Sequence, residues 1–344
     1  MKKKSICLVP EAKSLGGPRT FQQNLISCGA DSGEAEFHFD AGRADIDAFL
    51  VIGGPKDFLR TLLRARRKGI PVVQRLNGMN WIHRKRPCTL RYKLHSEAAN
   101  LAIAFFRRFV CTKIVYQSPF CRERWNRTYG RLSKPQTIIF NGTDLKRFSP
   151  DVSPDVSERI EILLVEGSFR FGMDFGLDVA VELANALSER MSRPVVLRIA
   201  GKTEPSAVTH VTEKSAGPVK VEFLGIVEKD EIIRLARKSA LFFSSEIHAA
   251  CPNAVIEALA CGLPVIGFDT GALKDVVGKG GIVVPYGTDP WNLEFPETQP
   301  LIDAAETVIR ENTAFRSAAR KQAEEHFNIA SMVKQYTDFC AGIE

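Results

Sequence analysis

One carboxylate interrupts an apolar stretch in the second half of the chain, which reads CPNAVIEALACGLPVIGFDTG from residue 251 to residue 271. The run before Gly262 predicts a short buried helix, with Pro252 in its first turn and Asn253 and Glu257 four residues apart on one face. Free amides and the helix dipole at such a start favour an anion such as a diphosphate. The alternative for Glu257 is a partly buried carboxylate paired with a lysine or an arginine.

A second turn follows the next apolar run, LPVIGFD. Thr270 and Gly271 bring another backbone turn and another helix start to the same edge of the predicted sheet. Backbone amides suit a phosphate, and an acid suits the hydroxyls of a ribose. The two turns together therefore predict a site for a nucleoside diphosphate.

Apolar strands alternate with helical stretches along the whole chain, and this alternation must position the two turns. The first half has the runs SICLVP, ADIDAFLVIG, IPVVQRLNG, TKIVYQS and TIIFNG. The pattern restarts at IEILLVEG and continues with PVVLRIAG, a polar loop, VKVEFLG, ALFFSS, LPVIGFD and GGIVVPYG. This order predicts an α/β protein with two doubly wound, Rossmann-like domains that face each other across a cleft. Ligands are expected outside the carboxyl ends of the strands.

The chain of 344 residues is too long for one ordinary core, which favours two domains. The segment FSPDVSPDVSER, residues 148–159, has no periodicity and is predicted to be the linker. We expect a first, acceptor-side domain over residues 1–150 and a second, donor-binding domain over residues 151–327. A helix at about residues 328–344 is expected to pack back on the first domain.

The charge differs between the two halves. Residues 1–150 carry 28 Lys and Arg against 11 Asp and Glu, whereas the whole chain has a net charge of only +7. A basic half attracts nucleic acid, or the phosphate of an anionic membrane or lipid-linked substrate; a solvated basic face is the alternative. Nucleic-acid binding favours many exposed aromatics among the cations, and Trp81, Tyr92 and Trp125 are few, so no nucleic acid is expected.

The sequence favours a cytoplasmic protein. The eight cysteines form no C-x-x-C pair and no cluster with histidine, which is typical of reduced thiols and not of disulfides or zinc. No stretch has the roughly 18 apolar residues of a membrane span, and the apolar run before Pro10 is too short for a signal peptide. The basic helices ending at Lys68 and in LAIAFFRRF suit an anionic inner leaflet, which predicts peripheral membrane contact; ordinary packing against the sheet is the alternative.

Five ordered elements resemble glycosyltransferase family 4, whose members are retaining enzymes with the GT-B fold. The run CPNAVIEALACGLPVIGFDTGALKDVV is similar to the donor-site signature of that family, and IIFNGTDLKRFSP to the element that ends its first domain. The other three elements are GGPRTF, IVYQSPFCRERW and VEFLGIVEKDEIIRLARKSALFFSS. The resemblance covers most of the chain and implies a divergent branch of the family.

The resemblance implies that Glu257 is the second acid of a glutamate–seven residues–glutamate motif, which holds the ribose hydroxyls of the donor. The first acid, which lies near the transferred sugar, falls on Ala249, and Glu246 lies three residues earlier. The remaining donor positions match the family, and they are Gly225, Asn253, Thr270 and Gly271.

Two cations that clamp the donor pyrophosphate in the family are replaced here by Ser168 and Phe175. Arg170 lies in the same loop, and we expect it to act with Glu257 in catalysis as the single clamp. Lys202, after the strand LRIAG, is a second candidate cation. The alternative for Arg170 is an ordinary surface arginine.

Five residues of the first domain are candidates for the substrate side. Gly16 and Gly17 would allow the backbone to approach the donor closely. Arg19, beside them, is expected to meet the acceptor or the diphosphate. Asn77 stands where the family often has a histidine, and His83 follows in NWIHRK as a further acceptor-side candidate, with a polar loop histidine as the alternative.

The resemblance implies transfer of a sugar, with retention of configuration, from a nucleotide-sugar to a saccharide or lipid-linked saccharide, in cell-surface polysaccharide or lipopolysaccharide assembly. Cations and helix amides would stabilise the charge on the leaving oxygen, so no metal and no other cofactor is expected. One alternative is a non-catalytic nucleotide-sugar-binding protein of the same fold. Another is a GT-B sugar-nucleotide epimerase, which needs acid and base groups that Ala249 does not supply.

Overall fold

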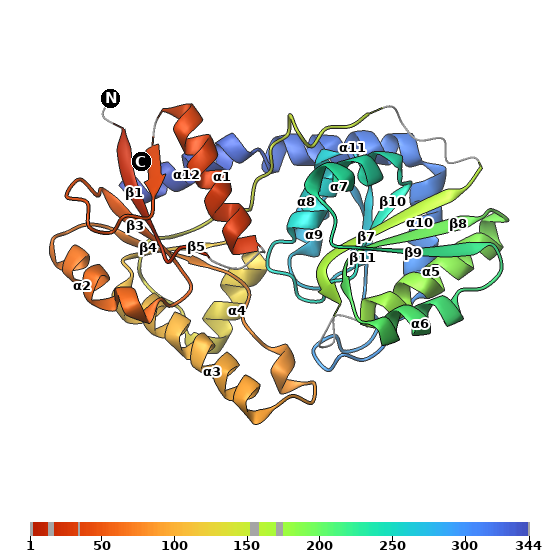
Figure 1. Ribbon diagram of the computed structural model, residues 1–344, viewed down its shortest axis with the longest axis horizontal. Coiled ribbons are helices and arrows are strands. Elements are labelled where there is room, and N and C mark those ends of the chain that lie inside the picture. The colour runs from red at the N-terminus through yellow and green to blue at the C-terminus, as the bar shows by residue number, and fades with distance from the viewer. Residues whose placement is uncertain (1–2, 13–16, 34, 152–157, 170–174, 343–344) are drawn as a thin grey trace. The chain divides into compact units, whose positions relative to one another are not determined.

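The chain forms two compact units in the computed structural model, which describes residues 3–12, 17–33, 35–151, 158–169 and 175–342. The first unit comprises residues 1–142 and 327–344, and the second comprises residues 143–326. Each unit is built on a six-stranded sheet with helices on both faces (Figure 1).

All strands of the first sheet run parallel, in the order β2-β1-β3-β4-β5-β6. Their bounds are β1 (Lys4–Val9), β2 (Ala35–His38), β3 (Ala48–Ile52), β4 (Val72–Leu76), β5 (Lys113–Tyr116) and β6 (Gln136–Ile138). Every residue of β3 and β4 is buried, because helices cover both faces of a parallel sheet.

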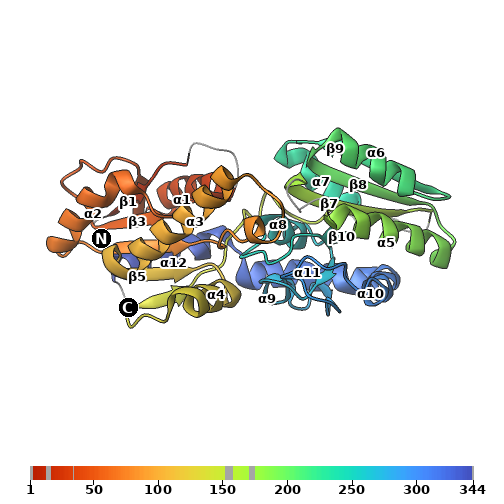
Figure 2. The same ribbon diagram turned by 90° about the horizontal axis from the view of Figure 1, so that it is seen from below.

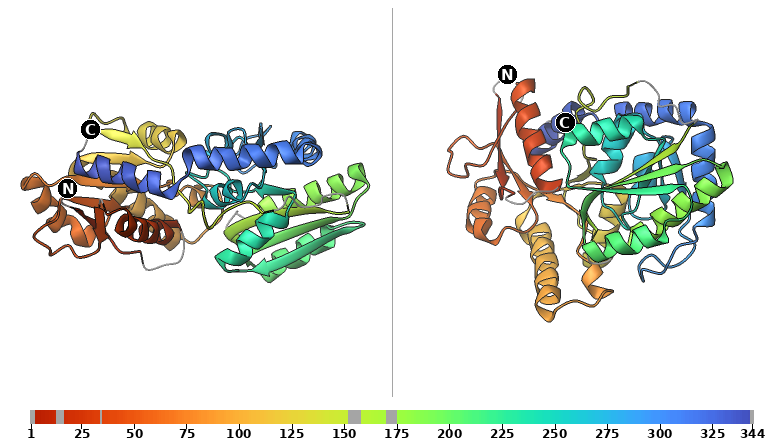
Figure 3. Two further views of the ribbon diagram at one scale, coloured as in Figure 1. Left: turned by 90° about the horizontal axis from the view of Figure 1, so that it is seen from above. Right: turned by 45° about the vertical axis from the view of Figure 1, so that its right-hand side comes forward.

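Helices cover the two faces of the first sheet. The bounds are α1 (Gly17–Ser32), α2 (Leu59–Arg67), α3 (Leu90–Phe105), α4 (Pro119–Tyr129) and α12 (Ile329–Ala341), with single turns at η1 (Lys56–Phe58) and η2 (Ile82–Arg84) and a π-helix η3 (Phe106–Val110). The C-terminal helix α12 lies along this sheet and packs on α1, β1 and β3 (Figure 3, left). Phe21 of α1 meets Tyr336 of α12 edge to face, with ring centroids 5.1 Å apart.

The second sheet is also parallel throughout, in the order β12-β11-β10-β7-β8-β9. Its strands are β7 (Ile160–Phe169), β8 (Val195–Thr203), β9 (Val219–Gly225), β10 (Leu241–Ser244), β11 (Val265–Phe268) and β12 (Gly281–Val284). Its helices are α5 (Phe175–Met191), α6 (Pro205–Lys214), α7 (Lys229–Lys238), α8 (Asn253–Ala260), α9 (Leu273–Val277), α10 (Gln299–Arg310) and α11 (Asn312–His326). Helix α5 lies next to α10 (Figure 2) and shares the main core of this unit with it.

The division between the units lies before Thr143, earlier than the boundary at residues 150 and 151 expected from the sequence. The reason is that residues 143–150 are anchored in the second unit. Phe148 is buried, and its carbonyl oxygen accepts a hydrogen bond from Arg320 Nη1 at 2.8 Å. Arg237 Nε donates to the carbonyl oxygen of Ser149 at 2.8 Å. Most of the expected linker, residues 152–157, lies outside the described residues.

Two elements differ from the sequence expectation. The segment expected to be a polar loop after β8 contains the helix α6, which begins with Pro205 in its first turn and buries Val211. The strand β2 was not predicted, and it extends the first sheet at the edge beside β1. The returning helix expected near residues 328–344 corresponds to α12.

Candidate functional site

The order of the second sheet reverses between β7 and β10. From β7 the chain adds β8 and β9 on one side, and it then adds β10, β11 and β12 on the other side. In open α/β sheets, ligands bind outside the carboxyl ends of the strands at such a reversal point. The residues at the carboxyl ends of β7 and β10 therefore mark the candidate site of this unit.

Two carboxylates meet at the reversal point. Glu166 lies on β7, and Ser245 and Glu246 follow β10. Ser245 Oγ donates a hydrogen bond to Glu166 Oε1 at 3.3 Å, and Gly176 at the start of α5 lies against Ser245. Burial raises the pKa of Glu246 to about 7. Burial and the charge of Glu246 raise the pKa of Glu166 well above its usual value. The pair therefore favours at least one protonated carboxyl group near neutral pH.

The loop after β10 packs on the turn after β11. The amide of Ala272 donates to the carbonyl oxygen of Ala249 at 2.9 Å, and the amide of His248 donates to Thr270 Oγ1 at 3.4 Å. Gly271 has a φ of +65°, and a Cβ there would lie 2.5 Å from the Ala249 oxygen. The structure thus brings together Ala249, Thr270 and Gly271. Glycine is needed at residue 271 for both its conformation and this close approach.

Glu257 lies in α8 and is buried, with a relative exposure of 7%. Its Oε1 forms a short ion pair with Lys229 Nζ at the start of α7. Glu257 is therefore a buried carboxylate paired with a lysine, which is the alternative that the sequence left open. No other hydrogen bond to this carboxylate occurs within the described part of the chain. Asn253 begins α8 one turn before Glu257, after Pro252. One oxygen of a buried carboxylate thus remains to accept a hydroxyl group.

The candidate cations lie at the carboxyl ends of β7 and β8. Lys202 is exposed on β8 and pairs in register with Ser168 of β7, so a cation stands on the strand next to Ser168. Arg170 lies outside the described residues, and Phe175 is the first residue of α5. Gly225 ends β9 with a φ of +64°.

In the first unit, Asn77 follows β4 and takes part in a polar network. Its Oδ1 accepts hydrogen bonds from Arg75 Nη1 at 2.6 Å and Gln117 Nε2 at 2.7 Å. Arg75 also donates to Asn141 Oδ1 at 2.8 Å, and its guanidinium lies over the ring of Phe21. These contacts fix the Asn77 side chain at the carboxyl edge of this sheet.

Among the described residues, no hydrogen bond or ion pair joins the other first-unit candidates to one another. Gly17 and Arg19 are exposed in the first turn of α1, and Gly16 lies outside the described residues. His83 is buried at 4% exposure and forms a hydrogen bond of 2.9 Å between its Nε2 and Glu97 Oε1 of α3. Glu97 also accepts from Arg84, and these partners lower its pKa. His83 therefore stabilises the turn before α3, and its acceptor-side role stays a prediction.

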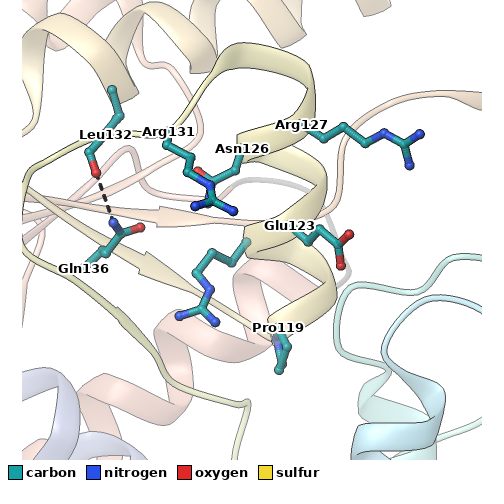
Figure 4. Close-up of a pocket in the computed structure, with 8 residues that line it drawn as sticks. Pro119, Glu123, Asn126, Arg127, Arg131, Leu132 and Gln136 are labelled. Carbon is teal, nitrogen blue, oxygen red and sulfur yellow. Dashed lines mark hydrogen bonds between the residues drawn. The ribbon is translucent and has the colours of Figure 1, made fainter.

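A cavity of about 690 Å³ opens beside α4 in the same unit (Figure 4). Its lining includes Arg122, Arg127 and Arg131, and its one acid is Glu123. Within the described part of the chain, none of these three guanidinium groups has a hydrogen bond or an ion pair. Such a cavity suits an anion.

Sequence reasoning missed Glu166, Lys229 and this cavity. A charged residue at the end of the apolar run IEILLVEG was the available signal for Glu166. Lys229 is 28 residues from Glu257, and no local pattern joins them. The arginines of α4 were counted only as part of a general basic region.

The described residues hold neither a metal-binding cluster nor a membrane-spanning helix. They contain no group of three or more His, Cys, Asp or Glu side chains arranged to hold a metal ion. They also contain no helix that is both long enough and apolar enough to cross a membrane.

Comparison with known proteins relates this geometry to a group of enzymes. Residues 161–293 match the family model described as glycosyl transferases group 1. No curated protein matches the chain in sequence. A glycosyltransferase from Rickettsia africae is similar in structure, with a TM-score of 0.71 and 16% identity over 100% of this chain and 99% of that one.

Two further solved structures are similar at this level. HepE from Anabaena in complex with UDP-glucose has a TM-score of 0.67 and 15% identity, covering 98% of this chain and 100% of that one. WaaG, a glycosyltransferase involved in lipopolysaccharide biosynthesis, has a TM-score of 0.68 and 16% identity, again covering 98% and 100%. The chain therefore has the GT-B fold of these structures, and its residues 161–293 match a group 1 glycosyl transferase domain, which supports a glycosyltransferase.

Proposed function

We propose that the protein is a retaining, metal-independent glycosyltransferase that moves a hexosyl or related sugar from a nucleotide-sugar to a saccharide or lipid-linked saccharide. The observation that carries the proposal is the group 1 match, which spans the reversal point and the whole of α8. HepE binds UDP-glucose, and WaaG is involved in lipopolysaccharide biosynthesis. These neighbours support a nucleotide-sugar donor and a role in cell-surface polysaccharide or lipopolysaccharide assembly.

The donor is proposed to bind at the carboxyl edge of the second sheet. The ribose hydroxyls donate to the oxygen of Glu257 that Lys229 leaves open. The amides at the start of α8, with Asn253, and the turn at Thr270 and Gly271 accommodate the diphosphate. Lys202 and Arg170 supply the positive charge that stabilises the leaving group. Gly225 allows close backbone approach.

A non-catalytic nucleotide-sugar-binding protein is the second candidate, favoured by one observation. Ala249 is buried at 2% exposure and offers no acid where the transferred sugar would lie. We propose that the enzyme uses Glu246 instead, because Glu246 and Ala249 lie in the same loop after β10. The two candidates differ in turnover, and both require donor binding.

A thermal-shift screen against UDP-, GDP-, dTDP- and ADP-sugars tests both candidates. A ligand at 100 times its dissociation constant adds about 2.7 kcal/mol to the free energy of unfolding, so one nucleotide class should raise the melting temperature. Glu257→Gln should abolish this rise, whereas Glu213→Gln, which changes an exposed acid on α6, should not. Absence of any shift in the wild type contradicts both candidates. If the protein binds a nucleotide-sugar but releases no nucleoside diphosphate when oligosaccharide and lipid-linked acceptors are present, the result favours the non-catalytic candidate.

We further propose that the first unit binds the inner face of an anionic membrane through α3 and η3. Leu90, Leu94, Leu101 and Phe105 recur at helical spacing, and the first three are 60–71% exposed. Arg91, Lys93 and Arg108 are exposed among them. An apolar stripe flanked by cations is typical of a helix that lies in the interface of an anionic bilayer.

Co-sedimentation with vesicles tests this contact. Vesicles of phosphatidylcholine with 30% phosphatidylglycerol should bind the wild type, and Leu94→Ser with Leu101→Ser should weaken binding at least about tenfold. Ile226→Ser removes an equally exposed apolar side chain in the second unit and serves as the control. Equal binding of all three proteins, or no binding of the wild type to these vesicles, contradicts the membrane contact.

A further inference from the structure

The cavity beside α4 collects hydrogen-bond donors without matching acceptors. Arg122 and Asn126 are four residues apart in α4 and share one helical face, and Arg131 follows the helix. In Figure 4, Asn126 and Arg131 lie on the side of α4 that faces Leu132 and Gln136. Glu123 extends from the other flank of the helix, away from Asn126 and Arg131.

The amide of Asn126 is held in one orientation from behind. Its Oδ1 accepts a hydrogen bond from Arg107 Nη2 at 2.6 Å, which leaves the NH₂ group of Asn126 as a donor. Arg107 is 1% exposed, and its other hydrogen bonds are to the hydroxyl of Tyr116 and the carbonyl oxygen of Gly130. Among the described residues, this buried guanidinium is hydrogen-bonded only to neutral oxygens, and it stands directly behind the cavity wall. Its charge is not offset by any of these partners, and charge of this kind favours an anion nearby.

Neighbouring cations show the same excess of positive charge. Burial, together with the charges of Arg84 and Arg127, lowers the pKa of Arg124. Burial, together with the charges of Arg66, Arg107 and Arg108, contributes to a lowered pKa of Lys134. An anion in the cavity would relieve part of this repulsion.

We propose that this cavity is a binding site for a phosphate-bearing group, held by Arg122, Arg131 and the NH₂ of Asn126. Guanidinium groups bind phosphate oxygens in pairs, and a volume of about 690 Å³ is of the size of known small-molecule sites. The site belongs to the first unit alone. It does not depend on the donor site proposed in the second unit, so either proposal can fail while the other stands.

Two sources of the phosphate are distinguished by two sets of probes. The soluble probes are inorganic phosphate and pyrophosphate, titrated by calorimetry at low salt, with amide exchange of residues 118–136 to locate the binding. The surface probe is a vesicle of phosphatidylcholine with 30% phosphatidylglycerol. Binding of soluble pyrophosphate that protects residues 118–136 identifies a soluble phosphate compound. Protection by vesicles alone identifies a lipid headgroup.

The decisive variant is Asn126→Asp. The new carboxylate keeps the hydrogen bond from Arg107, so the fold should persist, but it removes the NH₂ donor and adds a negative charge to the cavity. We expect at least tenfold weaker binding of the probe in Asn126→Asp and in Arg122→Ala with Arg131→Ala. The control is Arg60→Ala with Arg64→Ala, which removes two exposed cations of α2 and should change affinity less than twofold. Unchanged affinity in Asn126→Asp, or no protection of residues 118–136 by any probe, overturns the proposal.

Discussion

Glu246 gives the second unit a stability that depends on pH. Burial raises the pKa of this carboxyl group from its usual value of 4.5 to about 7 in the folded chain. Between these two values the folded state binds more protons than the unfolded state, so the free energy of unfolding falls as the pH rises. A shift of the Glu246 pKa from 4.5 to about 7 corresponds to about 3 kcal/mol of the free energy of unfolding. This contribution is fully present below pH 4.5 and is lost by about pH 7.

Glu246→Gln replaces this group by a neutral amide of nearly the same shape. The variant should lose the part of this fall that comes from Glu246, because the amide does not ionise. Burial still raises the pKa of Glu166, so the variant keeps a smaller fall in stability from that group. Below pH 4.5 the variant and the wild type should be similar, and near pH 8 the variant should be more stable by up to about 3 kcal/mol.

Urea unfolding at pH 4.5, 5.5, 6.5 and 8 provides the assay. Pulse labelling of backbone amides, read in peptides from residues 143–326 against an unfolded control at each pH, reports on the second unit alone. Glu213→Gln is the matched control because its carboxylate is exposed on α6. A wild-type stability that is constant or rises from pH 4.5 to 8, or parallel pH profiles for Glu246→Gln and the wild type, would refute the reasoning.

Three other substitutions test contacts within the second unit by urea unfolding. Lys229→Met leaves Glu257 buried without its partner and should lower the free energy of unfolding by about 1–2 kcal/mol. Adding Glu257→Gln should restore most of this loss. Gly271→Ala should lower the free energy of unfolding more than Gly217→Ala does. Both positions have positive φ, but only residue 271 has backbone atoms within 3 Å of the new Cβ. A loss of about 1 kcal/mol at both positions would contradict the close packing. Arg316→Met should cost about 2 kcal/mol, because the buried guanidinium donates to two backbone carbonyl groups, and a neutral result would show that water replaces it.

The fold follows closely from the alternation of apolar strands and helices. The apolar runs SICLVP and IEILLVEG form the interior strands β1 and β7, because both faces of a parallel sheet are covered and must be apolar. Helix α6 was not predicted, because valine and threonine dominate its middle and favour extended structure. Its signals were Pro205 at the start and the spacing of Ala207 and Val211 on one face.

The candidate site was predictable only where one local motif carries it. The spacing of Asn253 and Glu257 within an apolar helix was visible in the sequence, and the structure buries this helix. The partner of Glu257 was not visible, because it comes from another helix. The raised pKa values of Glu166 and Glu246 depend on burial by segments distant in the chain, and a sequence pattern does not report desolvation.

The assignment of α12 to the first unit has a consequence for how the protein is made. Val333, Tyr336 and Cys340 of this helix are buried in the same core as Ile6 and Leu8 of β1. A ribosome produces the first sheet early, and the helix that covers it only after the whole second unit has been synthesised. During this interval one face of the first sheet lacks its cover and presents apolar surface. The unit whose synthesis begins first is therefore the last to complete its core.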